Sequence, residues 1–204
     1  MTLKNTADRW GPVSQAFHWI IMLLILGLAI VGLTMGELPK TPKYFWVFTA
    51  HKSTGITVLV LVLARLAWRL YAGRPDPVPG TPGWQERIAS ATHWLLYALI
   101  LLMPVSGWLY DSASGLRPFR WFGLFDMPKL VPPNEGLRGL AHEVHEWGFW
   151  VLAALVCVHA GAALYHHYFQ RDATLLRMLP KRSPRIGDNP PSPPDPHRNS
   201  ADVP

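Results

Sequence analysis

Histidines are the residues of this 204-residue chain whose positions most directly predict chemistry, because four long apolar stretches carry histidines near their ends. His145 and His159 are fourteen residues apart in one such stretch. On a helix, this spacing separates them by about 21 Å and returns them to within about 40° of the same face. Polar groups are costly inside a membrane, so they indicate a function. Because neutral imidazole is a common axial ligand of haem iron, one helix could serve two haems, one near each membrane surface.

The stretches that carry these histidines are long enough to span a membrane. Half of the residues are hydrophobic and only 16% are charged, which is typical of a membrane protein of one domain. Residues 10–36, 88–110 and 147–170 contain no charged side chain, and each exceeds the roughly 20 residues that a crossing helix needs. A further span is expected over about residues 44–71, with Lys52, Arg65 and Arg69 near its ends. The sequence therefore predicts an all-α membrane protein, a bundle of four transmembrane helices.

The distribution of positive charge predicts the orientation of these helices. The amino terminus, the loop after the second span and the carboxyl-terminal tail hold 12 Lys and Arg residues, against 7 on the other side. Because cytoplasmic segments carry the excess of positive charge, both termini are expected in the cytoplasm. The first span is too long for the apolar part of a signal peptide, so we expect it to remain as an anchor. The net charge of +6 is explained by this topology, and nucleic acid is not an expected partner.

The histidines in the spans sort into two pairs by depth. His18 and His159 lie toward the cytoplasmic side, whereas His51 and His145 lie toward the outer side. Each pair can supply both axial ligands of one b-type haem. Such iron is low-spin and has no vacant position, which favours electron transfer over oxygen chemistry.

Two further histidines are alternative ligands. His93, on the third span, lies about 9 Å inside the inner edge and can replace His18. His142 competes with His145 because it lies three residues earlier on the same helix face, although nearer to the predicted loop. At the inner interface, a candidate quinone site is formed by His166, His167 and Arg171.

The segments outside the spans differ in composition. Residues 183–204 are rich in proline and are expected to form a disordered cytoplasmic tail. The outer loop, residues 111–138, contains the run RPFRWFGLFDMPKL, which is expected to lie on the membrane surface or to cap a cofactor. Gly32, Gly55 and Gly107 predict close packing around a flat cofactor. The one cysteine, Cys157, is expected to be a small core residue.

Several motifs resemble the prokaryotic cytochrome b561 family, which is related to the cytochrome b subunits of nickel-iron hydrogenases. The resemblance covers about residues 8–182 and is carried by RWGPVSQAFHW, AHKSTGI, HWLLYALILLMPVSGWL, RWFGLFDMP, HEWGFWVLAALVCVHAGAALYHHYF and DATLLRMLP. It implies a four-helix cytochrome of the bacterial inner membrane with two haem b groups. It also implies four axial ligands at the matching positions: His18, His51, His145 and His159.

The resemblance further implies an activity. Family members that look most like this chain oxidise superoxide at the outer face and reduce ubiquinone, which would make the protein a superoxide:quinone oxidoreductase. Lys52, next to His51, is expected to draw the superoxide anion toward the outer haem. The expected partners are therefore membrane lipid, quinone and superoxide.

Two other functions are compatible with the sequence. The protein can be a non-enzymatic electron carrier, namely a membrane-anchor subunit that passes electrons between a partner dehydrogenase or hydrogenase and quinone. The outer loop would then be the docking surface. The other alternative is a haem-free transporter, although the scarcity of acidic groups in the spans counts against it.

Overall fold

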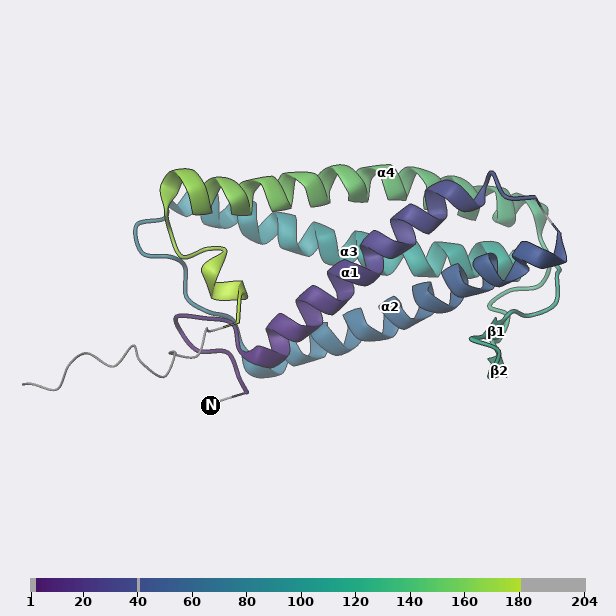
Figure 1. Ribbon diagram of the computed structural model, residues 1–204, viewed down its shortest axis with the longest axis horizontal. Helices are drawn as coiled ribbons and strands as arrows, with labels where there is room; N and C mark the ends of the chain where they lie inside the picture. Colours follow the sequence, from purple (N-terminus) through teal and green to yellow (C-terminus); the bar gives the residue numbers. More distant parts are fainter. Residues whose placement is uncertain (1–2, 40, 181–204) are drawn as a thin grey trace, which may run out of the picture.

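The computed structural model describes residues 3–39 and 41–180, and Figure 1 shows four long helices in them. These are α1 (Pro12–Met35), α2 (Phe45–Ala72), α3 (Gly83–Ala113) and α4 (Glu135–Tyr165). The shorter elements are η1 (Pro42–Tyr44), β1 (Arg120–Trp121), β2 (Phe125–Asp126), the π-helical turn η2 (His166–Gln170) and η3 (Leu176–Met178). The predicted disordered tail, residues 183–204, lies outside the described residues.

The predicted all-α bundle is confirmed, since all four helices are long and apolar enough to cross a membrane. Two of them begin earlier than the charge-free stretches suggest, α3 at Gly83 and α4 at Glu135. Asn134 explains the start of α4, because its side chain accepts a hydrogen bond from the Leu137 amide at 2.9 Å. Helix α2 ends where Gly73 adopts a φ of 75°, a conformation that favours glycine.

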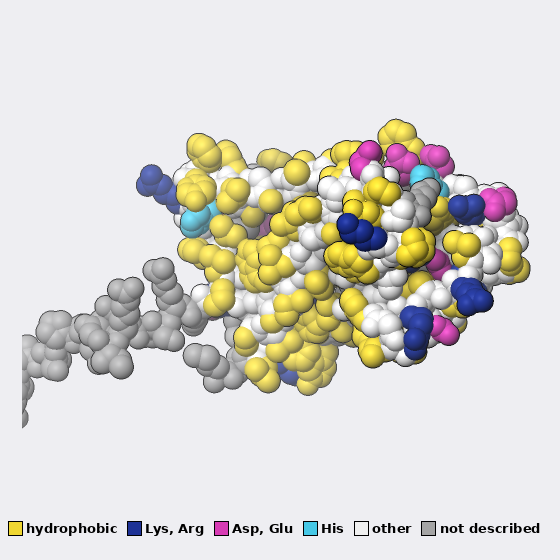
Figure 2. Space-filling view, turned by 45° about the vertical axis from the view of Figure 1, so that its right-hand side comes forward, with side chains coloured by type: hydrophobic (Ala, Val, Ile, Leu, Met, Phe, Trp, Pro, Cys, Tyr) yellow, Lys and Arg dark blue, Asp and Glu magenta, His cyan; other side chains and the backbone are white. Residues whose placement is uncertain are grey.

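Apolar side chains both fill the bundle and cover its outside. One core cluster joins three helices through Ile21, Val58, Val62 and Tyr97. Large apolar side chains also face outward, with Leu23 and Val158 more than 60% exposed. In Figure 2, such side chains cover the flank of the bundle, and most of the charged ones gather toward the right-hand end. An exterior of this kind matches a lipid environment.

Cys157 does not lie in the core as expected but is exposed on α4. The buried positions of α4 are Ala141, Gly148 and Leu152, which share one helix face. Cys157 falls outside this face, so the helix period directs its thiol outward.

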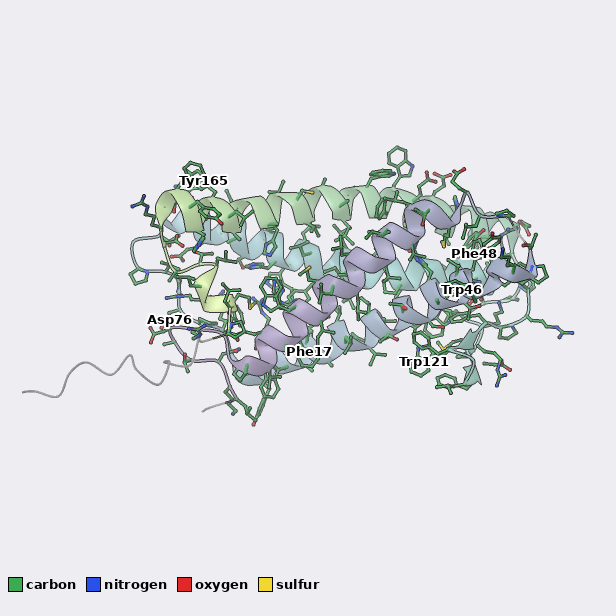
Figure 3. All side chains as sticks on the ribbon, in the orientation of Figure 1. Phe17, Trp46, Phe48, Asp76, Trp121 and Tyr165 are labelled. Carbon is green, nitrogen blue, oxygen red and sulfur yellow. The ribbon has the colours of Figure 1, made fainter. Side chains whose placement is uncertain are left out.

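The bundle has two distinct ends. The first described residues and residues 171–180 lie at one end, the terminal end, and residues 36–39, residues 41–44 and the β1–β2 hairpin lie at the other, the hairpin end (Figure 1). The main helix packing joins α1 to α2, α2 to α3 and α3 to α4, as in an up-and-down bundle. Aromatic side chains mark both ends, with Trp46, Phe48 and Trp121 at the hairpin end and Phe17 and Tyr165 toward the other (Figure 3).

The β1–β2 hairpin is held against the side of α2. The Trp121 indole donates a hydrogen bond to the Ser53 carbonyl at 3.2 Å, and the Phe122 amide donates to the Ser53 hydroxyl at 3.0 Å. The turn places Phe122 and Gly123 at positive φ, 43° and 77°. Phe122, Leu124 and Phe125 remain exposed, whereas Phe119 is buried. The aromatic run of the outer loop is therefore divided between packing on α2 and an exposed surface.

Candidate functional site

Four histidines come together as two pairs at opposite ends of the bundle. His18 of α1 faces His159 of α4 toward the terminal end, with ring centres 6.4 Å apart and planes at 79°. His51 of α2 faces His145 of α4 toward the hairpin end, also at 6.4 Å and with planes at 71°. Helix α4 contributes one histidine to each pair, as the fourteen-residue spacing predicts.

The geometry of both pairs fits a metal ion held between two imidazoles. Metal–imidazole bonds are about 2.0 to 2.1 Å long, so two opposed rings on one metal have their centres roughly 6 Å apart. Both pairs match this separation. Groups of three or more His, Cys, Asp or Glu side chains placed to hold a metal are absent from the described residues. A centre with only two protein ligands, such as haem iron, is thus the best match to these pairs.

The two alternative ligands fit less well. The His93 ring centre lies 5.4 Å from that of His159, which is a direct ring contact and too close for an intervening metal. The His142 side chain is 56% exposed and packs beside Tyr110 and Glu146, outside the His51–His145 pair. The geometry therefore favours His18 and His145 over these two residues.

Helix α3 fixes the ring of His145. Its Nδ1 donates a hydrogen bond to the Met103 carbonyl at 3.0 Å, and the Ser106 hydroxyl, which bonds the same carbonyl at 2.9 Å, lies 3.0 Å from that nitrogen. Because a carbonyl can only accept, Nδ1 carries the proton, and Nε2 is left with the lone pair that a metal needs. Sequence reasoning missed Met103 and Ser106, since neither has a side chain typical of a metal site.

Glycines make room for both histidines at the hairpin end. A Cβ atom on Gly107 would lie 3.2 Å from the His145 ring, and one on Gly32 would lie 3.3 Å from the His51 ring. Side chains at Gly32 and Gly107 would push the histidine rings out of position, which explains two of the three glycines that were predicted to allow close packing. A Cβ atom on Gly55 would meet nothing within 4 Å. The Nδ1 atom of His51 is buried and has no hydrogen-bond partner among the described residues, unlike that of His145.

Lys52 is not an isolated charge. Its ammonium group lies 2.7 Å from one oxygen of Asp111, and Lys129 lies 3.0 Å from the other. The Asp111 side chain is only 5% exposed. The two lysines and the aspartate together carry one positive charge, next in sequence to His51. Sequence reasoning missed this cluster, because Asp111 is 59 residues from Lys52.

The three residues expected to form a quinone site do not converge directly. His166 donates a hydrogen bond from Nδ1 to Asp172 at 2.5 Å, and the Thr174 amide donates to the other carboxylate oxygen at 2.8 Å. Between them, Arg171 turns the chain with a φ of 53° and is exposed. The ring of His167 packs instead beside that of Tyr168. The structure therefore adds Asp172 as the partner of His166.

Asp172 is ionised at neutral pH. Burial alone would raise the pKa of its carboxyl, but hydrogen bonds from His166 and Thr174 outweigh burial and hold the pKa below its ordinary value. The contribution of this carboxylate to the fold is therefore complete above the ordinary aspartate pKa and is lost only as the pH falls through the lowered value.

The last described residues close the terminal end. The Trp19 indole donates a hydrogen bond to the Met178 carbonyl at 3.0 Å, and the Gln15 amide donates to the Leu179 carbonyl at 3.1 Å. Arg9 also bonds the Leu179 carbonyl. Because the Trp19 ring centre lies 5.1 Å from that of His18, this segment covers the neighbourhood of the His18–His159 pair.

Comparison with known proteins agrees with this geometry. The model of the prokaryotic cytochrome b561 family matches residues 9–181. The chain belongs to this family. Members similar to it include the cytochrome b561 homolog 2 of Escherichia coli K12, which is 34% identical over 192 residues, 92% of this chain and 100% of that protein. The probable superoxide oxidase CybB of Yersinia pestis is 31% identical over 178 residues, 85% of this chain and 97% of that protein.

A more distant relative is the probable Ni/Fe-hydrogenase B-type cytochrome subunit of Cupriavidus necator. It is 22% identical over 218 residues, 87% of this chain and 86% of that protein. The family membership that the motifs predict is thus confirmed. A prokaryotic cytochrome b561 is an electron-transfer protein of the membrane, and membership implies that this chain binds b-type haem.

Proposed function

We propose that the protein is a superoxide:quinone oxidoreductase of the bacterial inner membrane, with both termini in the cytoplasm and the hairpin end in the periplasm. The observation that carries this proposal is the presence of two histidine pairs with the same 6.4 Å separation, one toward each end of the bundle. One haem b bound at each pair would supply one-electron transfer across the membrane. His51 and His145 would hold the periplasmic haem, and His18 and His159 the cytoplasmic one.

The reaction balances without a further co-reactant. Two superoxide anions each lose one electron and become O2, and one ubiquinone gains two electrons and two protons to become ubiquinol. Oxidation of superoxide by electron loss needs no vacant metal position, which suits sites that two histidines fill. Support for superoxide as the donor comes from the similarity to the probable superoxide oxidase CybB.

The charge next to His51 favours an anionic substrate. Lys52, Lys129 and Asp111 sum to one positive charge, and Arg117 lies in the same loop region, whereas Arg120 pairs with Asp126. A positive region attracts superoxide over a distance that salt shortens to about 8 Å at physiological ionic strength. Glu143 and Glu146 oppose this field on α4.

Replacing Lys52 with glutamine should slow superoxide-driven quinone reduction several-fold at low salt and have little effect at high salt, because steering is lost while Lys129 still pairs with Asp111. The measurement is ubiquinol formation by the purified, haem-loaded chain supplied with superoxide, over a series of salt concentrations. Lys4→Gln, at the other end of the bundle, is the matched control. Equal rates for Lys52→Gln and wild type at every salt concentration would exclude steering by Lys52. No ubiquinol from a chain that holds two haems would exclude the proposed activity.

We place the quinone site at the terminal end, beside His166, His167 and Arg171. The hydrogen-bonded pair of His166 and Asp172 supports this position, since quinone reduction consumes protons and an imidazole bound to a carboxylate is suited to deliver them. The carboxylate keeps the imidazole oriented.

Asp172→Asn should therefore slow ubiquinol formation about tenfold or more, a part of the roughly 100- to 10,000-fold that general acid catalysis contributes, while superoxide still reduces the protein. The two steps are followed separately in one stopped-flow experiment, by haem absorbance and by ubiquinol. Asp76→Asn removes a carboxylate from the same end and is expected to be silent. If Asp172→Asn leaves ubiquinol formation unchanged, His166 does not depend on this carboxylate.

A second function is a membrane-anchor subunit that passes electrons between a partner dehydrogenase or hydrogenase and quinone. The exposed Phe122, Leu124 and Phe125 of the hairpin favour it, as does the similarity to a hydrogenase cytochrome subunit. Co-purification of a redox partner, together with failure to oxidise superoxide, would select this function. Membership in a cytochrome family leaves the haem-free transporter without support.

A further inference from the structure

Helix α2 carries two arginines that have no acidic partner among the described residues. Arg65 and Arg69 are both half-buried and lie one turn apart in an apolar helix. Among residues 3–39 and 41–180, neither guanidinium forms a salt bridge or a side-chain hydrogen bond. Lys52, at the other end of the same helix, differs from both arginines because it forms a salt bridge with Asp111. Charges on a span are costly unless they are paired, so these two guanidinium groups are suited to bind an anion.

Both guanidinium groups point to the same aromatic ring. The Cζ atom of Arg65 lies 5.4 Å from the ring centre of the buried Tyr97, and that of Arg69 lies 5.6 Å from it. Arg69 also lies 5.6 Å from the ring centre of Trp94. The cation–π contacts are worth about 0.5 to 2 kcal/mol each and do not neutralise the charges. Two neighbouring positive charges repel one another, so one ligand with two negative charges would satisfy both.

The arginines lie beside the His18–His159 pair. Both contact Tyr97 of α3, one helical turn from His93, and the His93 ring centre lies 5.4 Å from that of His159. Arg65 follows His51 by fourteen residues, as His159 follows His145, so Arg65 and His159 are at about the same depth. Arg69 is one turn, about 6 Å, nearer to the terminal end. Arg65 therefore lies at the depth of the histidine pair, and Arg69 lies between that depth and the membrane surface.

Haem b carries two propionate carboxylates on one edge, which matches two guanidinium groups one helical turn apart. We propose that Arg65 and Arg69 bind the propionates of the haem at the terminal end. The assignment rests on the proposed pair of His18 and His159 and adds the groups that fix how the haem is rotated between them. Guanidinium is suited to this task because its planar fork donates two parallel hydrogen bonds to one carboxylate.

The phosphate of a membrane lipid is the competing anion. It is the weaker candidate, because Arg65 lies at the depth of the histidines and is half-buried against α3 rather than at the end of its helix. Arg74, which follows α2 and is exposed, is better placed for a headgroup. Arg74 thus serves as a control that removes the same charge from the same end.

The test compares haem b with its dimethyl ester, in which both carboxylates are blocked. The full chain with His145→Ala, which retains one proposed haem site, is loaded with either form, and loss of haem to apomyoglobin is followed. The chain should hold haem b more tightly than the ester. Arg65→Gln and Arg69→Gln should each weaken haem b binding about tenfold, the value of one lost charge-assisted hydrogen bond, and leave ester binding unchanged. Arg65→Lys should retain part of the preference, and Arg74→Gln all of it.

Three results would overturn the proposal. The first is equal retention of haem b and its ester by the chain with both arginines. The second is an equal loss of both forms in Arg65→Gln and Arg69→Gln. The third is a loss of bound phospholipid phosphorus in these variants with haem retention unchanged, which would assign the arginines to lipid. A wild-type chain that takes up no haem would overturn the proposed function itself, and haem content is measured first for that reason.

Discussion

Replacing His159 with alanine is expected to reduce the haem content of the chain from two to one. His159 faces His18 across the 6.4 Å separation that suits a shared metal, so its loss removes one of the two proposed axial ligands at the terminal end. The remaining haem, between His51 and His145, should still be reduced by superoxide. Ubiquinol formation should cease, because the site that we propose for quinone lies at the end that has lost its haem. The pyridine-haemochrome spectrum per polypeptide measures the haem content.

His93→Ala and His142→Ala are the matched controls for this experiment. His93 touches the His159 ring directly, and His142 is exposed, so both variants should keep two haems. Two haems in His159→Ala would contradict the pairing, and one haem in His93→Ala would make His93 the ligand in place of His18. Retention of the four-helix circular dichroism spectrum separates loss of a ligand from loss of the fold.

Replacing Asp111 with asparagine should cause the largest loss of stability among single changes at the hairpin end. Its buried carboxylate accepts hydrogen bonds from Lys52 at 2.7 Å and Lys129 at 3.0 Å, and the amide leaves both ammonium groups without a counter-charge. Breaking a fully buried pair costs about 3 to 5 kcal/mol. The lysine side chains are 35% and 24% exposed, so we expect about 2 kcal/mol, or roughly 4 to 8 °C in the unfolding midpoint.

The same substitution should accelerate superoxide oxidation at low salt, because it adds one positive charge beside the proposed substrate entrance. Asp126→Asn is the control, since that carboxylate is 68% exposed and pairs with Arg120 at the surface. It should leave the unfolding midpoint within about 1 °C, as expected for an exposed pair. The midpoint is measured by thermal unfolding in detergent. An unchanged midpoint in Asp111→Asn would show that hydration of the two lysines makes the carboxylate unnecessary for stability.

The sequence was most informative where a periodic pattern decided the structure. Charge-free stretches located three of the four spans, and the second was recognised although it carries Lys52, Arg65 and Arg69, because crossing a bilayer needs a fixed length of apolar helix. They did not locate the starts of α3 and α4, because helices extend beyond the lipid when a cap such as Asn134 stabilises the first turn. The exposed Cys157 was wrongly expected in the core, since composition alone does not show which helix face a lipid covers.

In the candidate site too, helix periodicity predicted some features and contacts between distant segments decided the others. The spacing of His145 and His159 was sufficient to predict one histidine at each end of α4, because it follows from helix geometry alone. The contacts that orient these residues join distant segments, such as the Met103 carbonyl, 42 residues from His145. Arg65 and Arg69 were visible in the sequence only as charges that set topology. That they form no salt bridge among the described residues becomes apparent only when the surrounding side chains are known.

The hydrogen bonds that close the terminal end also constrain the order in which the protein assembles. Gln15 and Leu179, which form a hydrogen bond with one another, are 164 residues apart. Helix α1 therefore cannot form this contact until residues 171–180 have been synthesised. Synthesis proceeds from the amino terminus at about 5 to 20 residues per second. During that interval α1 and the side of His18 near Trp19 are uncovered. Covering of this end is therefore among the last steps of biogenesis, after the histidines of all four spans have been synthesised.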